Sequence, residues 1–162
     1  MAKTKNDIDQ DRENFRSWGF IERQVEVGGI KITYFEIPAD LKAELKTFAY
    51  QCTSGNPQDG YVIGVSDSVR RDFQPFWAFH EFVEYMELPG VKGRCRMALD
   101  KELEAVPNIL TGEYIPIRAD FFRNLVGFAK AKPDKYSAEQ VAEFEASRDR
   151  LNELEKSLRG EK

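Results

Sequence analysis

Apolar and polar residues alternate along two short runs near the N-terminus. The first run covers residues 24–27, the second covers residues 30–34, and Gly28-Gly29 separates them. A period of two places alternate side chains on opposite faces of a strand, and a glycine pair suits a tight turn. The pattern therefore predicts a β-hairpin, whose second strand can continue to Ile37 and ends at Pro38.

Helical periodicity dominates the rest of the chain. A short apolar run over residues 61–65 predicts one more strand, and residues 53–60 have the composition of a loop. Apolar residues at helical spacing predict five helices, over about residues 41–49 (after Asp40 as the N-cap), 75–88, 91–106, 119–130 and 137–160. Pro107, Asn108 and Gly112 indicate a loop before the fourth of these helices.

The last predicted helix has the clearest beginning. Ser137 and Gln140 form a capping-box pattern. Phe144, Leu151 and Leu158 follow at intervals of seven, so one narrow stripe of this helix is apolar and the rest is charged. Such a helix packs against its own domain or pairs with a helix of a protein partner.

These elements predict an α+β fold, with a small, mainly antiparallel sheet packed against four or five helices. We expect a polar N-terminal segment (residues 1–14) that is frayed or a short surface helix. A single α+β domain (residues 15–132) and a C-terminal amphipathic helix (residues 133–162) follow. A length of 162 residues suits one such domain with its own core.

Composition removes several classes of function. The net charge of −4 argues against a protein built for general nucleic-acid binding. The N-terminal residues are polar, and no stretch approaches the roughly 20 apolar residues of a membrane span. Cys52 and Cys95 form no CxxC pair, and two such thiols are typical of a reduced compartment. We expect a soluble, cytoplasmic protein that binds neither membrane nor nucleic acid.

The chain contains one histidine, His80, which excludes any site that needs two histidines from one chain. His80 opens the motif H-E-x-x-E, with Glu81 next to it and Glu84 four residues on, within a predicted helix. Positions four apart project from one face of a helix. Imidazole and carboxylate are both ligands of zinc and other divalent ions.

This motif, the strand before it and the helix after it resemble the zincin metalloproteases over about residues 61–104. In H-E-x-x-H zincins two histidines hold the metal and the glutamate between them polarises the attacking water. The strand would correspond to the edge strand above the active-site helix. Here Glu84 stands in place of the second histidine.

The resemblance implies a zincin-like metal-binding domain. His80, Glu84 and Glu102 would hold a divalent ion, with zinc expected. Glu81 would be the general base of a metal-dependent hydrolase acting on peptide bonds, with a peptide or protein as substrate. Glu102 shares a helix face with Cys95 and Ala98. Cys95 is an alternative ligand, as is Glu104, which lies twenty residues after Glu84.

Other interpretations of the same residues stay open. His80 is flanked by apolar residues and suits a core histidine bonded to a neighbour, with the glutamates on a solvated face. A Cys95–His80 dyad is a further possibility. A different class of function is a non-catalytic adaptor on a degenerate zincin-like scaffold, which binds a protein partner through the C-terminal helix.

Overall fold

A computed structural model describes residues 3–39 and 49–160. The chain divides into two compact units, residues 1–91 and residues 92–162. This division differs from the predicted boundaries after residues 14 and 132. The helix predicted over residues 41–49 lies outside the described residues except at its end, where Ala49 belongs to a strand.

The first unit is built on a four-stranded sheet in the order β1-β2-β4-β3. The strands are β1 (Ile21–Val27), β2 (Ile30–Ile37), β3 (Ala49–Cys52) and β4 (Val62–Ser66). β1 pairs with β2 and β3 with β4 in antiparallel fashion, whereas β2 and β4 are parallel. The prediction of a small, mainly antiparallel sheet in an α+β fold is therefore confirmed.

The predicted hairpin is present with the predicted turn. Val27 pairs with Ile30, which leaves Gly28 and Gly29 as the two turn residues. Both glycines have positive φ, 58° and 79°. This conformation is unfavourable for residues with a Cβ and is the one that a two-residue hairpin turn of the right twist requires.

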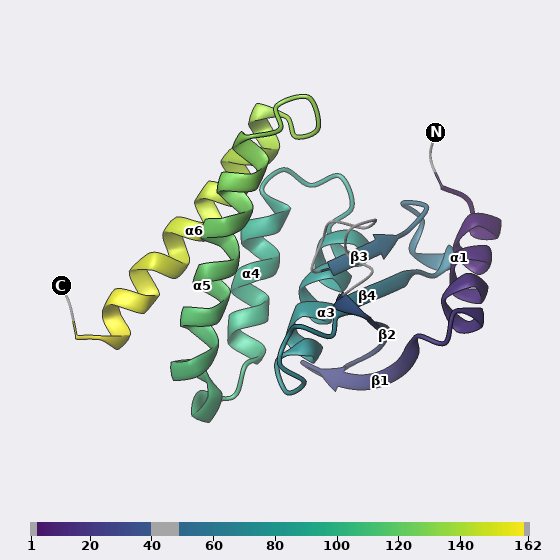
Figure 1. Cartoon of the computed structure of the whole chain (residues 1–162), viewed down its shortest axis with the longest axis horizontal. Helices are drawn as coiled ribbons and strands as arrows, with labels where there is room; N and C mark the ends of the chain where they lie inside the picture. The colour runs from purple at the N-terminus through teal and green to yellow at the C-terminus, as the bar shows by residue number, and fades with distance from the viewer. Residues whose placement is uncertain (1–2, 40–48, 161–162) are drawn as a thin grey trace. The chain divides into compact units, whose positions relative to one another are not determined.

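Two helices cover opposite faces of this sheet (Figure 1). Helix α1 (Lys5–Ser17) packs Ile8 and Phe15 against Phe35 and Ile37 of β2. Tyr34, on the other face of the same strand, bonds to the start of helix α3 (Gln74–Phe82). Of the two alternatives predicted for the N-terminal segment, the short surface helix is the one observed. Ile8 and Phe15, seven residues apart on one helix face, anchor it to the core, and its other residues are exposed or half-buried.

Beyond α3 the chain continues in a π-helical turn, η3 (Val83–Glu87), in which the Leu88 amide donates to the Val83 carbonyl at 3.0 Å. A short 3-10 turn, η2 (Pro57–Asp59), lies in the loop predicted between β3 and β4. The strand predicted before the motif corresponds to β4, but β4 is an inner strand with neighbours on both sides. The apolar run of residues 61–65 is typical of a central strand, and all residues of β4 are buried. The edge strand that the zincin resemblance implies is not found, because β3 pairs with the other side of β4.

The second unit consists of helices α4 (Arg94–Ala105), α5 (Asn108–Lys130) and α6 (Ala138–Leu158). α6 packs against both α4 and α5. The core of this unit combines Cys95 and Leu99 of α4 with α5 side chains and Leu151 of α6. α6 begins with the predicted capping box, in which Ser137 and Gln140 each bond to the backbone of the other.

Most of the apolar stripe on α6 packs inside this unit. Leu151 is fully buried and Phe144 packs on the same core, while Leu158 is about half exposed. None of the helices within residues 3–39 and 49–160 is long and apolar enough to cross a membrane.

Candidate functional site

The helix that carries the H-E-x-x-E motif is fixed to the sheet at its first residue. Gln74 is buried, accepts a hydrogen bond of 3.0 Å from the Tyr34 hydroxyl, and donates to Glu36 Oε2 at 2.8 Å and to the Val69 carbonyl at 3.0 Å. Pro75 follows in the first turn, where a missing N–H is tolerated. These three bonds use every polar group of the Gln74 amide and attach α3 to the central strand β2.

Glu36 is a buried carboxylate that two arginines neutralise. Arg23 Nη2 lies 3.4 Å from Oε1, and Arg71 Nε lies 3.6 Å from Oε2. Burial by itself raises the pKa of Glu36, but the Gln74 hydrogen bond and the charge of Arg23 outweigh it, so the pKa lies below its ordinary value. The hydrogen-bond network that attaches α3 to β2 therefore contains an ionised carboxylate.

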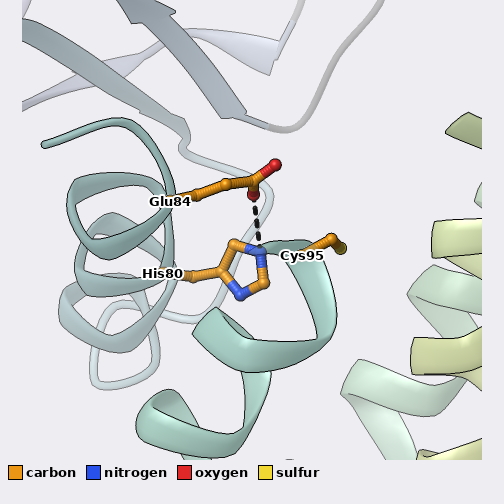
Figure 2. A group of neighbouring side chains, drawn as sticks. All are labelled: His80, Glu84 and Cys95. Carbon is orange, nitrogen blue, oxygen red and sulfur yellow. Dashed lines mark hydrogen bonds and ion pairs between the residues drawn. The ribbon is translucent and has the colours of Figure 1, made fainter. Parts of the chain in front are cut away.

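Two residues of the motif come together on α3 and η3. The His80 imidazole Nε2 lies 3.1 Å from the Glu84 carboxylate Oε2, and both side chains point the same way in Figure 2. The His80 side chain is 3% exposed and that of Glu84 is 13% exposed. The predicted i,i+4 relationship is confirmed, and the pair lies away from bulk water, where electrostatic interactions are strong.

Glu84 belongs to the π-helical turn. Such turns contain one more residue per hydrogen-bonded ring than an α-helix and occur frequently at functional sites. Glu81 is on the same helix, directly after His80, and is half-buried. It therefore has access to solvent that His80 lacks.

In the second unit, Glu102 lies among the charged groups of a buried network. Arg118 of α5 donates to it twice, from Nε to Oε2 at 2.8 Å and from Nη2 to Oε1 at 3.0 Å, and the Tyr114 hydroxyl also donates to Oε2. Both carboxylate oxygens of Glu102 thus accept hydrogen bonds from α5. The role of metal ligand predicted for Glu102 would require an ion to compete with the Arg118 guanidinium.

The electrostatics of this network follow from burial. Burial by itself lowers the pKa of Arg118, but the adjacent Glu102 carboxylate more than offsets it and raises that pKa. Burial and the same carboxylate raise the pKa of Tyr114 well above its ordinary value. The three groups therefore form a neutral combination of one anion, one cation and one phenol.

The alternative ligands of α4 lie in different environments. Cys95 is buried, and its Sγ lies 3.4 Å from Oγ of Ser147 in α6. Glu104 is exposed. The predicted shared face of Cys95, Ala98 and Glu102 is confirmed, because all three are buried and face the interior of the unit.

Two side chains of the first unit could each supply one ligand atom to a metal ion: the His80 imidazole nitrogen and a Glu84 carboxylate oxygen (Figure 2). The sequence indicates both through the spacing of the motif. It gave no sign that Arg118, Tyr114 and Ser147 contact the candidate ligands, since these contacts join separate helices.

Comparison of the chain with protein-family models, with curated proteins and with solved structures gives no match. The resemblance to zincins therefore remains a prediction from the motif, and the chemistry of the site has to be argued from its own residues.

Proposed function

We propose that this protein binds a divalent metal ion, with His80 and Glu84 as two of the ligands. The observation that carries the proposal is the buried pair itself, in which Nε2 and Oε2 are 3.1 Å apart. Two ligand atoms about 2.0–2.1 Å from a tetrahedral zinc ion lie roughly 3.3 Å from each other. An ion can therefore take the place of the shared proton with little movement of either side chain.

The further ligands of this proposal come from the sequence, which offers Glu102, Cys95 and Glu104. Glu102 is the least suited of them, because Arg118 donates to both of its carboxylate oxygens. A dication at Glu102 would face the buried Arg118 cation, and like charges in a buried site repel strongly.

Zinc is the ion that these two donors favour. An imidazole nitrogen and a carboxylate oxygen are both common zinc ligands, whereas magnesium and calcium prefer oxygen ligands alone. In catalytic zinc sites one position of the tetrahedral ion stays open for water.

A hydrolytic role would follow from that open position. The ion would polarise a peptide carbonyl, and Glu81 would accept the proton of the attacking water. The water oxygen would bond to the carbonyl carbon, the C–N bond would break, and the proton would leave on the amine. In Glu81→Gln, hydrolysis is expected to be lost while the metal stays bound. Unchanged hydrolysis in that variant would remove Glu81 from the mechanism.

Metal analysis tests the binding proposal directly. Protein purified under zinc-replete conditions and then dialysed is expected to retain one zinc per chain. His80→Ala and Glu84→Gln should each lose it, whereas Glu102→Gln should keep it. Glu87→Gln, an exposed carboxylate of the same π-helical turn, is the matched control. Wild-type protein without zinc would reject the proposal, and loss in Glu102→Gln would restore Glu102 as a ligand.

The alternative, a non-catalytic adaptor that binds its partner through the C-terminal helix, stays a prediction. Leu151 is buried and Phe144 is partly buried in the core of the second unit, so most of the apolar stripe of α6 packs inside that unit. The adaptor function would gain support if wild-type protein held no zinc and a chelator did not change its thermal stability.

A further inference from the structure

A pocket of about 230 Å³ lies between α1 and the sheet, within the first unit. Its lining comes from α1, β1, β2 and the segment 60–63 that leads into β4, and neither His80 nor Glu84 belongs to it. The volume is below the roughly 300–1,000 Å³ of pockets for drug-sized ligands. The pocket therefore suits a small molecule, and its chemistry is separate from that of the proposed metal site.

The pocket lies where β2 extends beyond its parallel partner. β4 pairs with β2 from Phe35 onwards, so the amide of Thr33, two residues earlier, donates to the Tyr61 hydroxyl at 3.1 Å instead of to a strand. Gly60 has a φ of 85°, a conformation that favours glycine, and turns the chain just before Tyr61. A gap is therefore left where a longer β4 would continue the sheet.

Hydrogen-bond donors gather in this pocket. Arg12 donates from Nη1 to Asp9 at 3.1 Å and from Nη2 to the Tyr61 carbonyl at 2.9 Å, which leaves its Nε–H and one N–H on each terminal nitrogen for a ligand. The Tyr61 hydroxyl accepts from Thr33, and its own hydrogen has no acceptor within residues 3–39 and 49–160. The Arg12 side chain is 27% exposed, so its bonds to an anion would be partly shielded from water.

We propose that this pocket binds a small monocarboxylate, which accepts hydrogen bonds from Arg12 and Tyr61. The lining contains two cations, Arg12 and Arg16, and one anion, Glu22, which lies 3.0 Å from Arg16 Nη2. This single net positive charge matches one carboxylate, whereas a phosphate dianion would bring excess negative charge next to Glu22. A guanidinium also fits the planar carboxylate through two parallel hydrogen bonds.

The remainder of the ligand would be short and apolar. Phe35 and Val62 line the pocket and belong to the core that α1 covers. An apolar group that contacts them is removed from water, so affinity should increase from acetate through butyrate to benzoate as the buried apolar area grows.

NMR titration of the full chain with benzoate tests the proposal. The backbone amide signals of Thr33, Gly60 and Tyr61 are expected to shift saturably, whereas benzamide, a neutral molecule of similar shape, should leave them unchanged. Arg12→Gln should weaken benzoate binding by at least about 10-fold, because hydrogen bonds to a charged group are lost. Lys5→Gln, which removes an exposed cation of α1 outside the pocket, is the matched control and should bind like wild type.

Glu22→Gln tests the charge argument in the opposite direction. It adds one net positive charge to the lining and releases the Arg16 guanidinium, so benzoate affinity is expected to rise by about 2- to 5-fold. Lining charges that only stabilise the fold would produce no such gain. If Arg12→Gln does not fold, Arg16→Gln replaces it, since that side chain is 47% exposed, and it should lower the affinity.

Four results would overturn the proposal. They are the absence of saturable shifts with benzoate, equal shifts with benzamide, tighter binding of inorganic phosphate than of benzoate, and an equal loss of affinity in Lys5→Gln and Arg12→Gln. The last result would mean that the ligand is attracted to the charge of α1 in general and not to the pocket.

Discussion

Glu102 and Arg118 form a doubly hydrogen-bonded ion pair between α4 and α5, and both side chains are almost completely buried. The planar guanidinium matches the two carboxylate oxygens, and this geometry makes the pair strong and directional. The pair explains why a glutamate occupies the buried face of α4 beside Cys95 and Ala98. Its first role is to connect two helices of the second unit.

Removal of one partner of this pair should destabilise the protein strongly. Arg118→Met would leave the Glu102 carboxylate buried without a cation, at an expected cost of about 3–5 kcal/mol in the free energy of unfolding. Urea denaturation measures this loss in the free energy of unfolding. Arg96→Met, which breaks the exposed pair with Asp100, is the control and should cost no more than about 1 kcal/mol. A similar small cost for Arg118→Met would show that the buried pair contributes little.

The parallel contact of β2 and β4 depends on a glycine. A Cβ on Gly64 would overlap Cδ1 of Ile37 and lie 3.0 Å from its Cγ1. Gly64→Ala is therefore expected to cost about 1–3 kcal/mol in unfolding free energy, since overpacking displaces neighbouring side chains. Ile37→Val removes the Cδ1 atom and should restore part of the loss in the double variant.

The matched control for that substitution is Gly112→Ala in α5, where an added Cβ has no neighbour within 4 Å. Alanine is the better helix former, so this variant should be stabilised by up to about 1 kcal/mol. Thermal unfolding of both variants measures the difference. Equal effects at the two glycines would contradict the packing argument at Gly64.

The Glu36 network should make stability depend on pH in the acid range. Because the folded pKa of Glu36 lies below its ordinary value of 4.5, the ionised carboxylate stabilises the fold above that pH. This contribution is lost as the pH falls through the folded pKa. Glu36→Gln should therefore be less stable than wild type at pH 7, and the difference should shrink below about pH 4.5.

Denaturant unfolding at a series of pH values measures this effect. Glu26→Gln, an exposed carboxylate on β1, is the control, and its difference from wild type should stay small at every pH. A Glu36→Gln difference that remains constant down to pH 3 would mean that the charge of Glu36 does not stabilise the fold.

Much of the fold could be predicted where local chemistry decides it. Gly28-Gly29 specifies the hairpin turn, and the capping box at Ser137 begins α6. Over the first half of α5 the sequence predicts a loop, because Pro107, Asn108 and Gly112 are typical of loops. The structure contains Pro116 inside α5. Packing of Tyr114 and Ile115, both buried on that segment, outweighs the local preference.

In the candidate site, too, the sequence predicts the local contact and misses the contacts between helices. The His80–Glu84 contact follows from a spacing of four residues on one helix, so the sequence predicted it. The partners of Glu102 and Cys95 come from α5 and α6, sixteen and fifty-two residues further on. Contacts of that sequence separation depend on how helices pack, which periodicity alone does not determine.

X-ray absorption spectroscopy of zinc-loaded wild-type protein tests the proposed site most directly, together with metal analysis of His80→Ala. The wild-type spectrum is expected to contain nitrogen and oxygen ligands at about 2.0–2.2 Å and the signal of one imidazole ring. His80 is the one histidine of the chain, so no other residue can supply that ring. Failure of the wild type to retain stoichiometric zinc, a zinc shell without an imidazole, or zinc retained by His80→Ala would contradict a site made by His80 and Glu84.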